Sequence, residues 1–223
     1  MKPKLWISHV LGALVFFTVI YISAGTLHFW QGHVYVGLGL LMMLLNYTVL
    51  RVDKALLEER SKPGLNTKPW DKRILGLSFL ATIAMFIVAG LDAGRFHWSP
   101  KFPWYIALIG IVLTATGQLL FMIAQKQNKF FSSTVRIQTD RSHTVCNEGL
   151  YKVVRHPGYL GSLLQAIGFP LLFGAVWSSI PVGVSILLQL IRTKMEDDTL
   201  QNELSGYSDY AQQVKYRLIP FIW

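Results

Sequence analysis

The stretch RHPGYLGSLLQAIGFPLLFGAVWSSIPVGVSILLQLIRTKMEDD, residues 155–198, holds the pattern on which the fold of this chain depends. No Asp, Glu, Lys or Arg occurs in it from Pro157 to Ile191. A helix that crosses the hydrocarbon core of a bilayer needs about 20 apolar residues. The uncharged run is therefore long enough for two crossings, with a turn at GAVWSS, and it predicts a membrane hairpin that returns to the side where it began.

The rest of the chain contains three more uncharged stretches, at residues 5–50, 74–91 and 102–125. The first is long enough for two crossings and the others for one crossing each. Charged residues make up 15% of the chain, against about 25% in an ordinary soluble domain. The sequence therefore predicts an all-α, polytopic membrane helix bundle, with six spans at residues 6–26, 34–50, 74–91, 103–124, 158–174 and 177–193.

Lys2 and Lys4 before the first apolar run also fit the start of a secretory signal peptide. The run is too long for the apolar part of such a peptide, and no clean cleavage site of small residues follows it. We therefore interpret residues 6–26 as the first span of the bundle.

The distribution of basic residues predicts how the bundle is oriented. Of the 21 Lys and Arg residues, only Arg95 and Lys101 fall on one side of the six spans, and the other 19 fall on the opposite side. Cytoplasmic loops carry the excess of Lys and Arg, so we expect both termini and both long loops, 51–73 and 125–156, in the cytoplasm. This role accounts for the net charge of +9, and we expect membrane lipids rather than nucleic acid as partners. Cys146 is the only cysteine, which excludes an intrachain disulfide and a cysteine-rich metal site, and we expect no metal.

The hydrophilic segments carry weaker structural signals. The 51–73 loop begins with the helical pattern RVDKALLEER and then has turn signals at Pro63-Gly64 and Pro69. The alternation TVRIQT at 134–139 indicates a short extended piece. After the last span we expect the helix to continue, to break near Gly206, and to be followed by a short helix that ends before Pro220.

Charged residues at the two ends of the final hairpin could carry chemistry. Arg192 and Glu196 are four residues apart, so both side chains can face one small volume. A simple ion pair at a solvated helix end explains the same spacing. At the other end, Arg155 and His156 precede Pro157, and a basic membrane boundary before a first-turn proline explains them equally well. Because the hairpin returns both ends to one face, His156, Tyr159, Arg192 and Glu196 can meet at one cytoplasmic mouth.

Several motifs in order resemble a known family. HTVCNEGLYKVVRHPGYLG at 143–161, RTKMEDDTL at 192–200 and GYSDYAQQVKYRLIPFIW at 206–223 resemble the isoprenylcysteine carboxyl methyltransferase family of integral membrane methyltransferases, in particular its bacterial branch. The resemblance covers about residues 126–223. It divides the chain into four N-terminal spans with a basic cytoplasmic loop, 1–125, and a methyltransferase-like catalytic region, 126–223.

The resemblance implies S-adenosylmethionine as the cofactor. It implies that Arg192 binds the carboxylate of the acceptor and forms the catalytic pair with Glu196. Gln138 matches less closely, because the loop before His143 is shorter than in eukaryotic members, and Asp197 stands where the family has a second Glu. The residues implied in cofactor binding are Gln138, His143, Thr144, Val145, Cys146, Tyr151, His156, Pro157, Gly158, Tyr159 and Glu196.

The function expected from these features is methylation of a carboxylate, or a related nucleophile, on a lipidic and isoprenylcysteine-like acceptor. No residue identifies the acceptor, and nothing in the sequence indicates an obligate protein partner. Two alternatives stay open: a phospholipid or amine methyltransferase, and an NADPH-dependent membrane reductase of the sterol-reductase type. The longer Asn- and Lys-rich cofactor segments expected of such a reductase are absent.

Overall fold

The computed structural model describes residues 3–51, 54–61 and 67–223, and these residues form helices and connecting loops without a strand. The all-α prediction is therefore confirmed. The longer helices are α1 (Pro3–Ala24), α2 (Trp30–Leu45), α3 (Lys54–Ser61), α4 (Pro69–Ala89), α5 (Trp104–Gln127), α6 (Pro157–Phe173), α7 (Ser179–Glu203) and α8 (Tyr207–Gln213). Short π-helical segments, η1 (Asn46–Leu50) and η2 (Gly90–Phe96), extend α2 and α4, and the short 3-10 turns are η3 (Thr139–Arg141), η4 (Gly149–Lys152) and η5 (Val176–Ser178).

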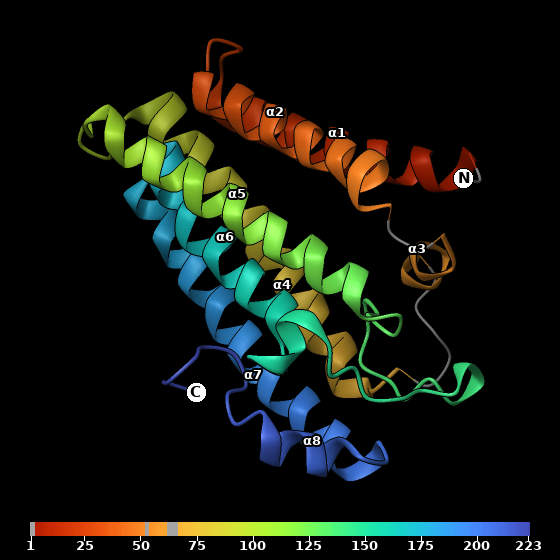
Figure 1. The fold of residues 1–223 in the computed structure, drawn as a ribbon. Helices are drawn as coiled ribbons and strands as arrows, with labels where there is room; N and C mark the ends of the chain where they lie inside the picture. Colours follow the sequence, from red (N-terminus) through yellow and green to blue (C-terminus); the bar gives the residue numbers. More distant parts are fainter. Residues whose placement is uncertain (1–2, 52–53, 62–66) are drawn as a thin grey trace.

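Helices α4 to α7 run alongside one another, and the α1–α2 hairpin lies along one side of them (Figure 1). Among the described residues, four helical runs are long and apolar enough to cross a bilayer: Trp30–Leu50, Pro69–Phe96, Trp104–Gln127 and Val176–Glu203. The described apolar parts of the two remaining expected spans are shorter, Leu14–Ala24 and Pro157–Phe173. The multi-span character is thus supported, and the number six stays a prediction.

Helices α5 and α6 approach each other closely because glycines face each other in their contact. A Cβ placed on Gly161 would lie 2.5 Å from the carbonyl oxygen of Gly117, and one on Gly168 would lie 2.7 Å from Oγ1 of Thr114. Small residues at such contacts let two membrane helices pack backbone to backbone. This contact fixes the start of α6, and with it the residues of the RHPGYLG motif, against the end of α5.

The far end of the bundle is held by a buried carboxylate. Asp92, which is fully buried, accepts hydrogen bonds from the backbone nitrogens of Ser99 (2.7 Å) and Trp177 (3.0 Å). The predicted hairpin turn is confirmed here: Gly174 ends α6 with φ +64, and η5 leads into α7. The α6–α7 hairpin is thereby anchored at its closed end, which leaves its open end to form a site.

The segment TVRIQT forms no strand, and its last residue, Thr139, begins η3, so the short extended piece stays a prediction. The carbonyl of Val135 accepts a hydrogen bond from the backbone nitrogen of Lys68 at 3.1 Å. One local prediction was wrong. Pro69 lies in the first turn of α4 rather than in a turn between elements, a position where its missing N–H costs nothing. The expected turn at Pro63-Gly64 lies outside the described residues. In the tail, α7 ends at Glu203, Gly206 has φ +80, and α8 follows, as predicted from the pattern.

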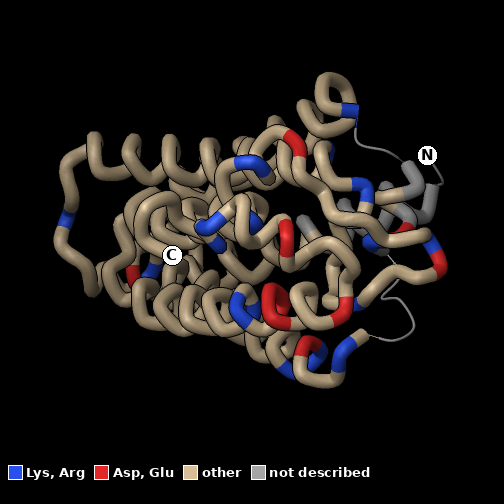
Figure 2. Tube along the Cα trace, turned by 60° about the horizontal axis from the view of Figure 1, so that its bottom comes forward, with Lys and Arg blue, Asp and Glu red and all other residues tan. Residues whose placement is uncertain are grey.

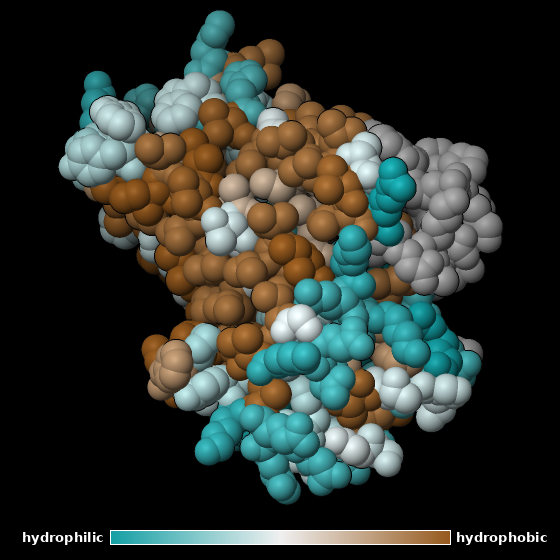
Figure 3. Space-filling view, in the orientation of Figure 1, coloured by the Kyte–Doolittle hydropathy of each residue, from teal (hydrophilic) through white to brown (hydrophobic). Residues whose placement is uncertain are grey.

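The surface matches a protein that sits in a bilayer. Figure 3 shows a broad hydrophobic area over the helices, with hydrophilic side chains around α8 and the adjoining loops and a smaller group at the opposite end. Figure 2 shows the same division in charge, since Lys, Arg, Asp and Glu lie mostly on loops and helix ends while the long helix bodies carry few. The two hydrophilic segments singled out in the sequence therefore meet at one end of the molecule.

Candidate active site

A cavity of about 300 Å³ lies at the hydrophilic end of the bundle, under the loop that joins α5 to α6. Its walls come from α3, α4, α5, this loop, α6, α7 and the tail. Of the eleven residues expected to bind the cofactor, ten line it: Gln138, His143, Thr144, Val145, Cys146, Tyr151, His156, Gly158, Tyr159 and Glu196. Pro157 does not line the cavity, because its ring is buried in the first turn of α6.

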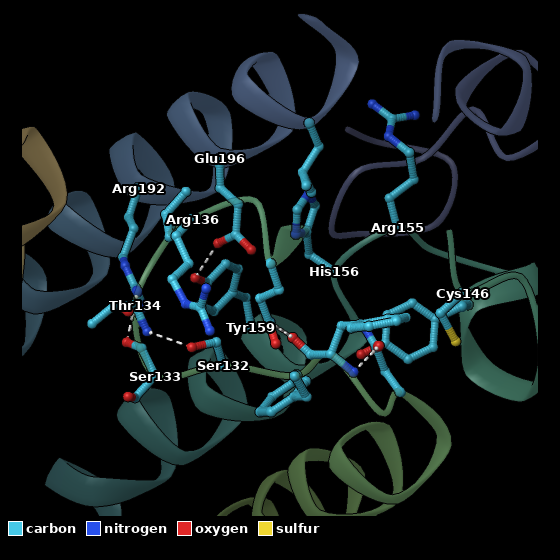
Figure 4. Close-up of a pocket in the computed structure, with 18 of the residues that line it drawn as sticks. Ser132, Ser133, Thr134, Arg136, Cys146, Arg155, His156, Tyr159, Arg192 and Glu196 are labelled. Carbon is cyan, nitrogen blue, oxygen red and sulfur yellow. Dashed lines mark hydrogen bonds between the residues drawn. The ribbon is translucent and has the colours of Figure 1, made fainter. Parts of the chain in front are cut away.

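Glu196 and Tyr159 lie together in this cavity, as the hairpin predicted (Figure 4). The hydroxyl of Tyr159 donates a short hydrogen bond to Oε2 of Glu196. His156 stacks on the ring of Tyr159, with centroids 5.7 Å apart and planes inclined by 17°. On the other side of the motif, a Cβ on Gly158 would lie 2.6 Å from the Phe131 ring. The start of α6 therefore presents a flat aromatic surface with a carboxylate at its edge.

Arg192 also faces the cavity, but the simple ion pair with Glu196 is not formed. Its Nε donates to Oδ1 of Asp71 at 2.7 Å, and its Nη2 donates to the carbonyl of Ser133 at 3.0 Å. The guanidinium carbon lies 5.4 Å from the centre of the Tyr159 ring. Arg192 is thus held between α4, the α5–α6 loop and α6, with its Nη1 not hydrogen-bonded to any described residue.

Asp71 is a site residue that sequence analysis missed. It is fully buried in the first turn of α4, and its Oδ2 accepts a hydrogen bond from the backbone nitrogen of Val135 at 2.7 Å. One carboxylate therefore connects α4, the α5–α6 loop and Arg192 of α7. The only signal in the sequence was an acid two residues after the first-turn Pro69, and such an acid is common at helix N-termini.

Arg155 and Asp197 play a part that differs from the sequence expectation. Arg155 lines the cavity but is only 7% exposed, and its Nε and Nη2 donate to the two oxygens of Asp197 at 2.8 and 2.9 Å. Asp197 was expected among three acids at the membrane surface, yet it is fully buried. Its other hydrogen-bond partners are His156, Gln201, Tyr207 and Arg217.

The C-terminal tail is joined to the same place through the backbone. The nitrogens of Arg155 and His156 donate to the carbonyls of Tyr216 and Arg217 at 3.0 and 2.9 Å. Leu218, just beyond, is fully buried. The tail therefore closes the back of the RHPGYLG motif and keeps His156 facing the cavity.

The loop over the cavity is held by its own polar side chains. Gln138, 1% exposed, donates from Nε2 to the carbonyl of Phe130 (2.7 Å) and accepts at Oε1 from Nη1 of Arg141 (2.7 Å). Burial, together with the positive charges of Arg136 and Arg141, lowers the pKa of His143 to about 4. His143 is therefore a neutral ring at physiological pH, packed 4.5 Å from the Phe130 ring.

Both halves of the chain contribute walls to the cavity. Arg60, Leu75, Ser78 and Phe121 belong to the N-terminal region, and they face residues of the C-terminal region across the space. Tyr207 and Tyr210 of the tail complete the lining, and Tyr210 donates to the carbonyl of Tyr151 at 2.7 Å. The cavity combines aromatic surface, one carboxylate at Glu196 and several arginines, a lining that suits a ligand with a flat ring and with charged groups of both signs.

Residues 102–202 match the isoprenylcysteine carboxyl methyltransferase (ICMT) family. The match begins one helix earlier than the sequence resemblance suggested, at the start of α5, and ends within α7. It includes the loop, the α6–α7 hairpin and both charged ends of that hairpin.

Curated relatives include two plant methyltransferases. A probable protein-S-isoprenylcysteine O-methyltransferase from Oryza sativa subsp. indica is 25% identical over 122 residues, which cover 53% of this chain and 63% of that protein. Protein-S-isoprenylcysteine O-methyltransferase B from Arabidopsis thaliana is also 25% identical over 122 residues, covering 53% and 61%. The chain thus spans about three-fifths of the length of these relatives.

A mouse sterol reductase and a solved methyltransferase structure are also similar to this chain. A Delta(14)-sterol reductase from Mus musculus is 26% identical over 139 residues, covering 53% of this chain and 31% of that reductase. The solved structure of the eukaryotic intramembrane Ras methyltransferase ICMT matches with a TM-score of 0.51 and 21% identity, over 92% of this chain and 71% of that one. At this identity the structural likeness establishes a common fold, and it extends to the N-terminal helices, which the family match leaves out.

Proposed function

From the match of residues 102–202 to the isoprenylcysteine carboxyl methyltransferase family, we propose that the protein is an integral membrane methyltransferase of this family. It uses S-adenosylmethionine and methylates the carboxylate of a lipidic acceptor that resembles an isoprenylcysteine. The observation that carries the proposal is the meeting of Tyr159, Glu196 and Arg192 in one cavity, beside eight further residues that the family resemblance assigns to the cofactor. The plant relatives are named as isoprenylcysteine O-methyltransferases, which agrees with it.

The lining of the cavity fits S-adenosylmethionine. Its volume of about 300 Å³ is at the lower end of ligand pockets, which measure about 300–1,000 Å³. The stacked rings of His156 and Tyr159 offer a flat apolar surface for an adenine. Gly158 lets the Phe131 ring pack directly against the start of α6, because a Cβ there would lie 2.6 Å from that ring. When bound, the cofactor supplies a methyl group on a positively charged sulfonium.

The electrostatics suit transfer to an anionic acceptor. Glu196 places a negative charge near the positive groups of the cofactor, and Tyr159 orients its carboxylate through the short hydrogen bond. Arg192, fixed by Asp71 and Ser133, keeps Nη1 for the carboxylate of the acceptor. A carboxylate is itself the nucleophile, so no general base is required. The residues of this chain need only align the two reactants and exclude water, and alignment alone can supply a large part of the rate enhancement.

The location of the cavity fits a lipidic acceptor. Its lining residues come from the hydrophilic end of the bundle, and Figure 3 shows that the hydrophobic surface adjoins this end. A lipid in the bilayer and a water-soluble cofactor can therefore approach it from different sides. From the excess of basic residues in the long loops we propose that the cavity and both termini face the cytoplasm.

The proposal is tested by incubating membranes that contain the protein with methyl-labelled S-adenosylmethionine and identifying the labelled lipid. We expect a base-labile methyl ester on a lipid-linked carboxylate. A base-stable label on an amine headgroup would instead support a phospholipid or amine methyltransferase. Absence of label, with membranes lacking the protein as control, would refute a methyltransferase.

A second candidate is a nicotinamide-dependent membrane reductase, which the similarity to the mouse Delta(14)-sterol reductase favours. Calorimetry of the detergent-purified protein separates the two. Methyl transfer requires binding of S-adenosylmethionine or its demethylated product and predicts no binding of NADPH. The opposite result would favour the reductase.

A further inference from the structure

A second cavity of about 580 Å³ lies next to the candidate active site, between α2, α3, α5 and α6. Arg60 and Phe121 line both cavities, so the two share one wall. The second cavity is within the range of about 300–1,000 Å³ that holds a drug-sized ligand. Arg60 is thus the charged group at the boundary between a large cavity in the helix bundle and the space beside Tyr159 and Glu196.

The second cavity is lined by uncharged polar groups as well as apolar ones. Thr114 is 6% exposed, and its Oγ1 has no hydrogen-bond partner. The buried Oδ1 of Asn46 is unpaired as well. Buried polar atoms are almost always hydrogen-bonded, so these two unpaired atoms mark a polar part of the cavity wall, although Oγ1 of Thr114 itself lies against Gly168 of α6. Further lining residues are the amides Gln118, Gln125 and Gln165 and the apolar Leu38, Met42, Met43 and Met122.

The charge of Arg60 is not balanced in the way that the other cavity arginines are. Arg136 pairs with Glu59 and Asp140, Arg155 pairs with Asp197, and Arg192 pairs with Asp71. Arg60 donates from Nη1 to the carbonyls of Phe131 and Ser132, both at 3.2 Å. Among the side chains that the structure describes, no carboxylate pairs with it.

The surroundings of Arg60 make an anion favourable there. Its guanidinium carbon lies 5.0 Å from the centre of the Phe131 ring and 5.6 Å from that of Phe121. Burial lowers the pKa of Arg60, and the positive charge of Arg192 lowers it further, against the opposing influence of Tyr159. A partly desolvated cation next to a second cation is costly unless an anion is bound.

We propose that Arg60 binds the anionic group of the acceptor and that the second cavity holds the uncharged polar part of the same molecule. The inference rests on the proposed function, since it assigns contacts to the acceptor rather than to the cofactor. The ligand class that fits is a lipid whose carboxylate adjoins amide or hydroxyl groups. A plain hydrocarbon chain would offer no hydrogen-bonding group to the polar side chains of this wall, such as Thr114 and Gln118, whereas an amide or hydroxyl would. Arg60 and Arg192 then hold the carboxylate from two sides.

The charge is tested by direct binding, so that the result does not depend on turnover. Detergent-purified protein is saturated with S-adenosylhomocysteine and titrated with N-acetyl-S-farnesylcysteine or with its methyl ester. We expect the unchanged protein to bind the acid at least about tenfold more tightly than the ester, since a desolvated charge pair is strong. Arg60→Gln should reduce this preference to within about twofold, and Arg60→Lys should keep most of it.

The control for charge is Arg51→Gln, which removes an exposed arginine from the same basic loop. A preference for the acid that survives Arg60→Gln would overturn the inference, and so would equal binding of acid and ester by the unchanged protein. Failure of the proposed function would show separately, as absence of any binding of S-adenosylhomocysteine. Retained binding of that molecule by Arg60→Gln also shows that the variant is folded.

The second cavity is tested with Thr114→Val and Gln118→Leu, which remove hydrogen-bonding groups and keep the size of the side chain. Both should weaken binding of N-acetyl-S-farnesylcysteine about fivefold. Neither should weaken binding of palmitate, which has a carboxylate without an amide. The matched control is Thr116→Val, an exposed position on the same helix. Equal effects on both ligands, or none on either, would refute the assignment of this cavity.

Discussion

Asp71 accepts a 2.7 Å hydrogen bond from Arg192, although the two residues are 121 positions apart in the chain. The same carboxylate holds the loop over the cavity through the backbone nitrogen of Val135. Asp71 thus fixes one side of the Arg192 guanidinium and the loop beside it with a single buried group. It does not line the cavity, so we regard it as a residue that positions Arg192.

Asp71→Asn should reduce methyl transfer more than it reduces cofactor binding. The amide keeps the shape and loses the charge that orients Arg192, and a small displacement of a positioning group can cost about 100-fold in rate. We expect kcat to fall at least about tenfold, with the dissociation constant of S-adenosylmethionine changed less than about twofold. The measurement is initial-rate kinetics together with calorimetry.

Two variants control for a general loss of structure. Asp209→Asn removes an exposed acid from α8 and should leave both quantities unchanged. Asp71→Glu keeps the charge and should restore part of the rate. If Asp71→Asn weakens cofactor binding as much as it slows turnover, its role is to stabilise the fold rather than to position Arg192.

Glu196→Gln should weaken binding of S-adenosylmethionine by at least about tenfold, because the amide cannot offset the positive charges of the cofactor. Glu203→Gln, an exposed change on the same helix, is the matched control and should have little effect. Calorimetry of the two purified variants gives the comparison. Equal affinity in both would exclude Glu196 from the cofactor site.

His143 should make the protein less stable in acid. Its pKa in the folded protein is about 4, below the ordinary value of 6.5, because burial and then Arg136 and Arg141 disfavour its charged form. Between pH 6.5 and about 4 the unfolded chain therefore binds a proton that the folded chain does not. The contribution of His143 to stability is complete above pH 6.5 and is lost progressively as the pH falls towards 4.

His143→Phe should remove this part of the pH dependence. We expect the midpoint of thermal unfolding to fall less between pH 7 and pH 5 in the variant than in the unchanged protein. His97→Phe, at an exposed histidine of the opposite end, is the control. A parallel decline in all three proteins would show that other groups determine the acid sensitivity.

Asp197→Asn should destabilise the fold. Asp197 is fully buried and pairs with Arg155, Arg217 and Tyr207, so the variant leaves buried positive charge without its counterion. Removal of one partner from a buried ion pair costs about 3–5 kcal/mol. Asp198→Asn changes the neighbouring, far more exposed acid and should cost much less. Unfolding of the two variants in detergent, followed by circular dichroism, measures the difference, and equal stability would contradict the central role of Asp197.

Features that depend on a local run of residues could be predicted from the sequence, whereas features that depend on tertiary packing could not. The spans and the α6–α7 hairpin depend on the length of uncharged runs, so residues 157–191 alone determine that part of the fold. The meeting of Tyr159 with Glu196 follows from the same hairpin. The partners of Arg192 and Arg155 depend instead on which buried carboxylate tertiary packing brings near. For that reason Asp71 could not be identified as the partner of Arg192. The place of Asp197 in a run of three acids likewise gave no sign that its carboxylate is buried and pairs with several side chains.

Because α5 and α6 pack closely, replacing a glycine by alanine should change the stability of the protein in opposite directions at Gly161 and Gly183. Gly161→Ala places a methyl group 2.5 Å from the carbonyl oxygen of Gly117 and 2.8 Å from the nitrogen of Phe121. The two helices must then move apart, and such overpacking costs about 1–3 kcal/mol. Gly183 lies in α7 with no neighbouring atom within 4 Å of a built Cβ. Gly183→Ala should therefore stabilise the protein by up to about 1 kcal/mol, since alanine is the better helix former.

Thermal unfolding of the two variants should shift the midpoint in opposite directions. Because α6 carries His156 and Tyr159 at its start, Gly161→Ala should also weaken cofactor binding, whereas Gly183→Ala should not. A Gly161→Ala variant as stable and as tight-binding as the unchanged protein would show that the helix contact is looser than the structure has it.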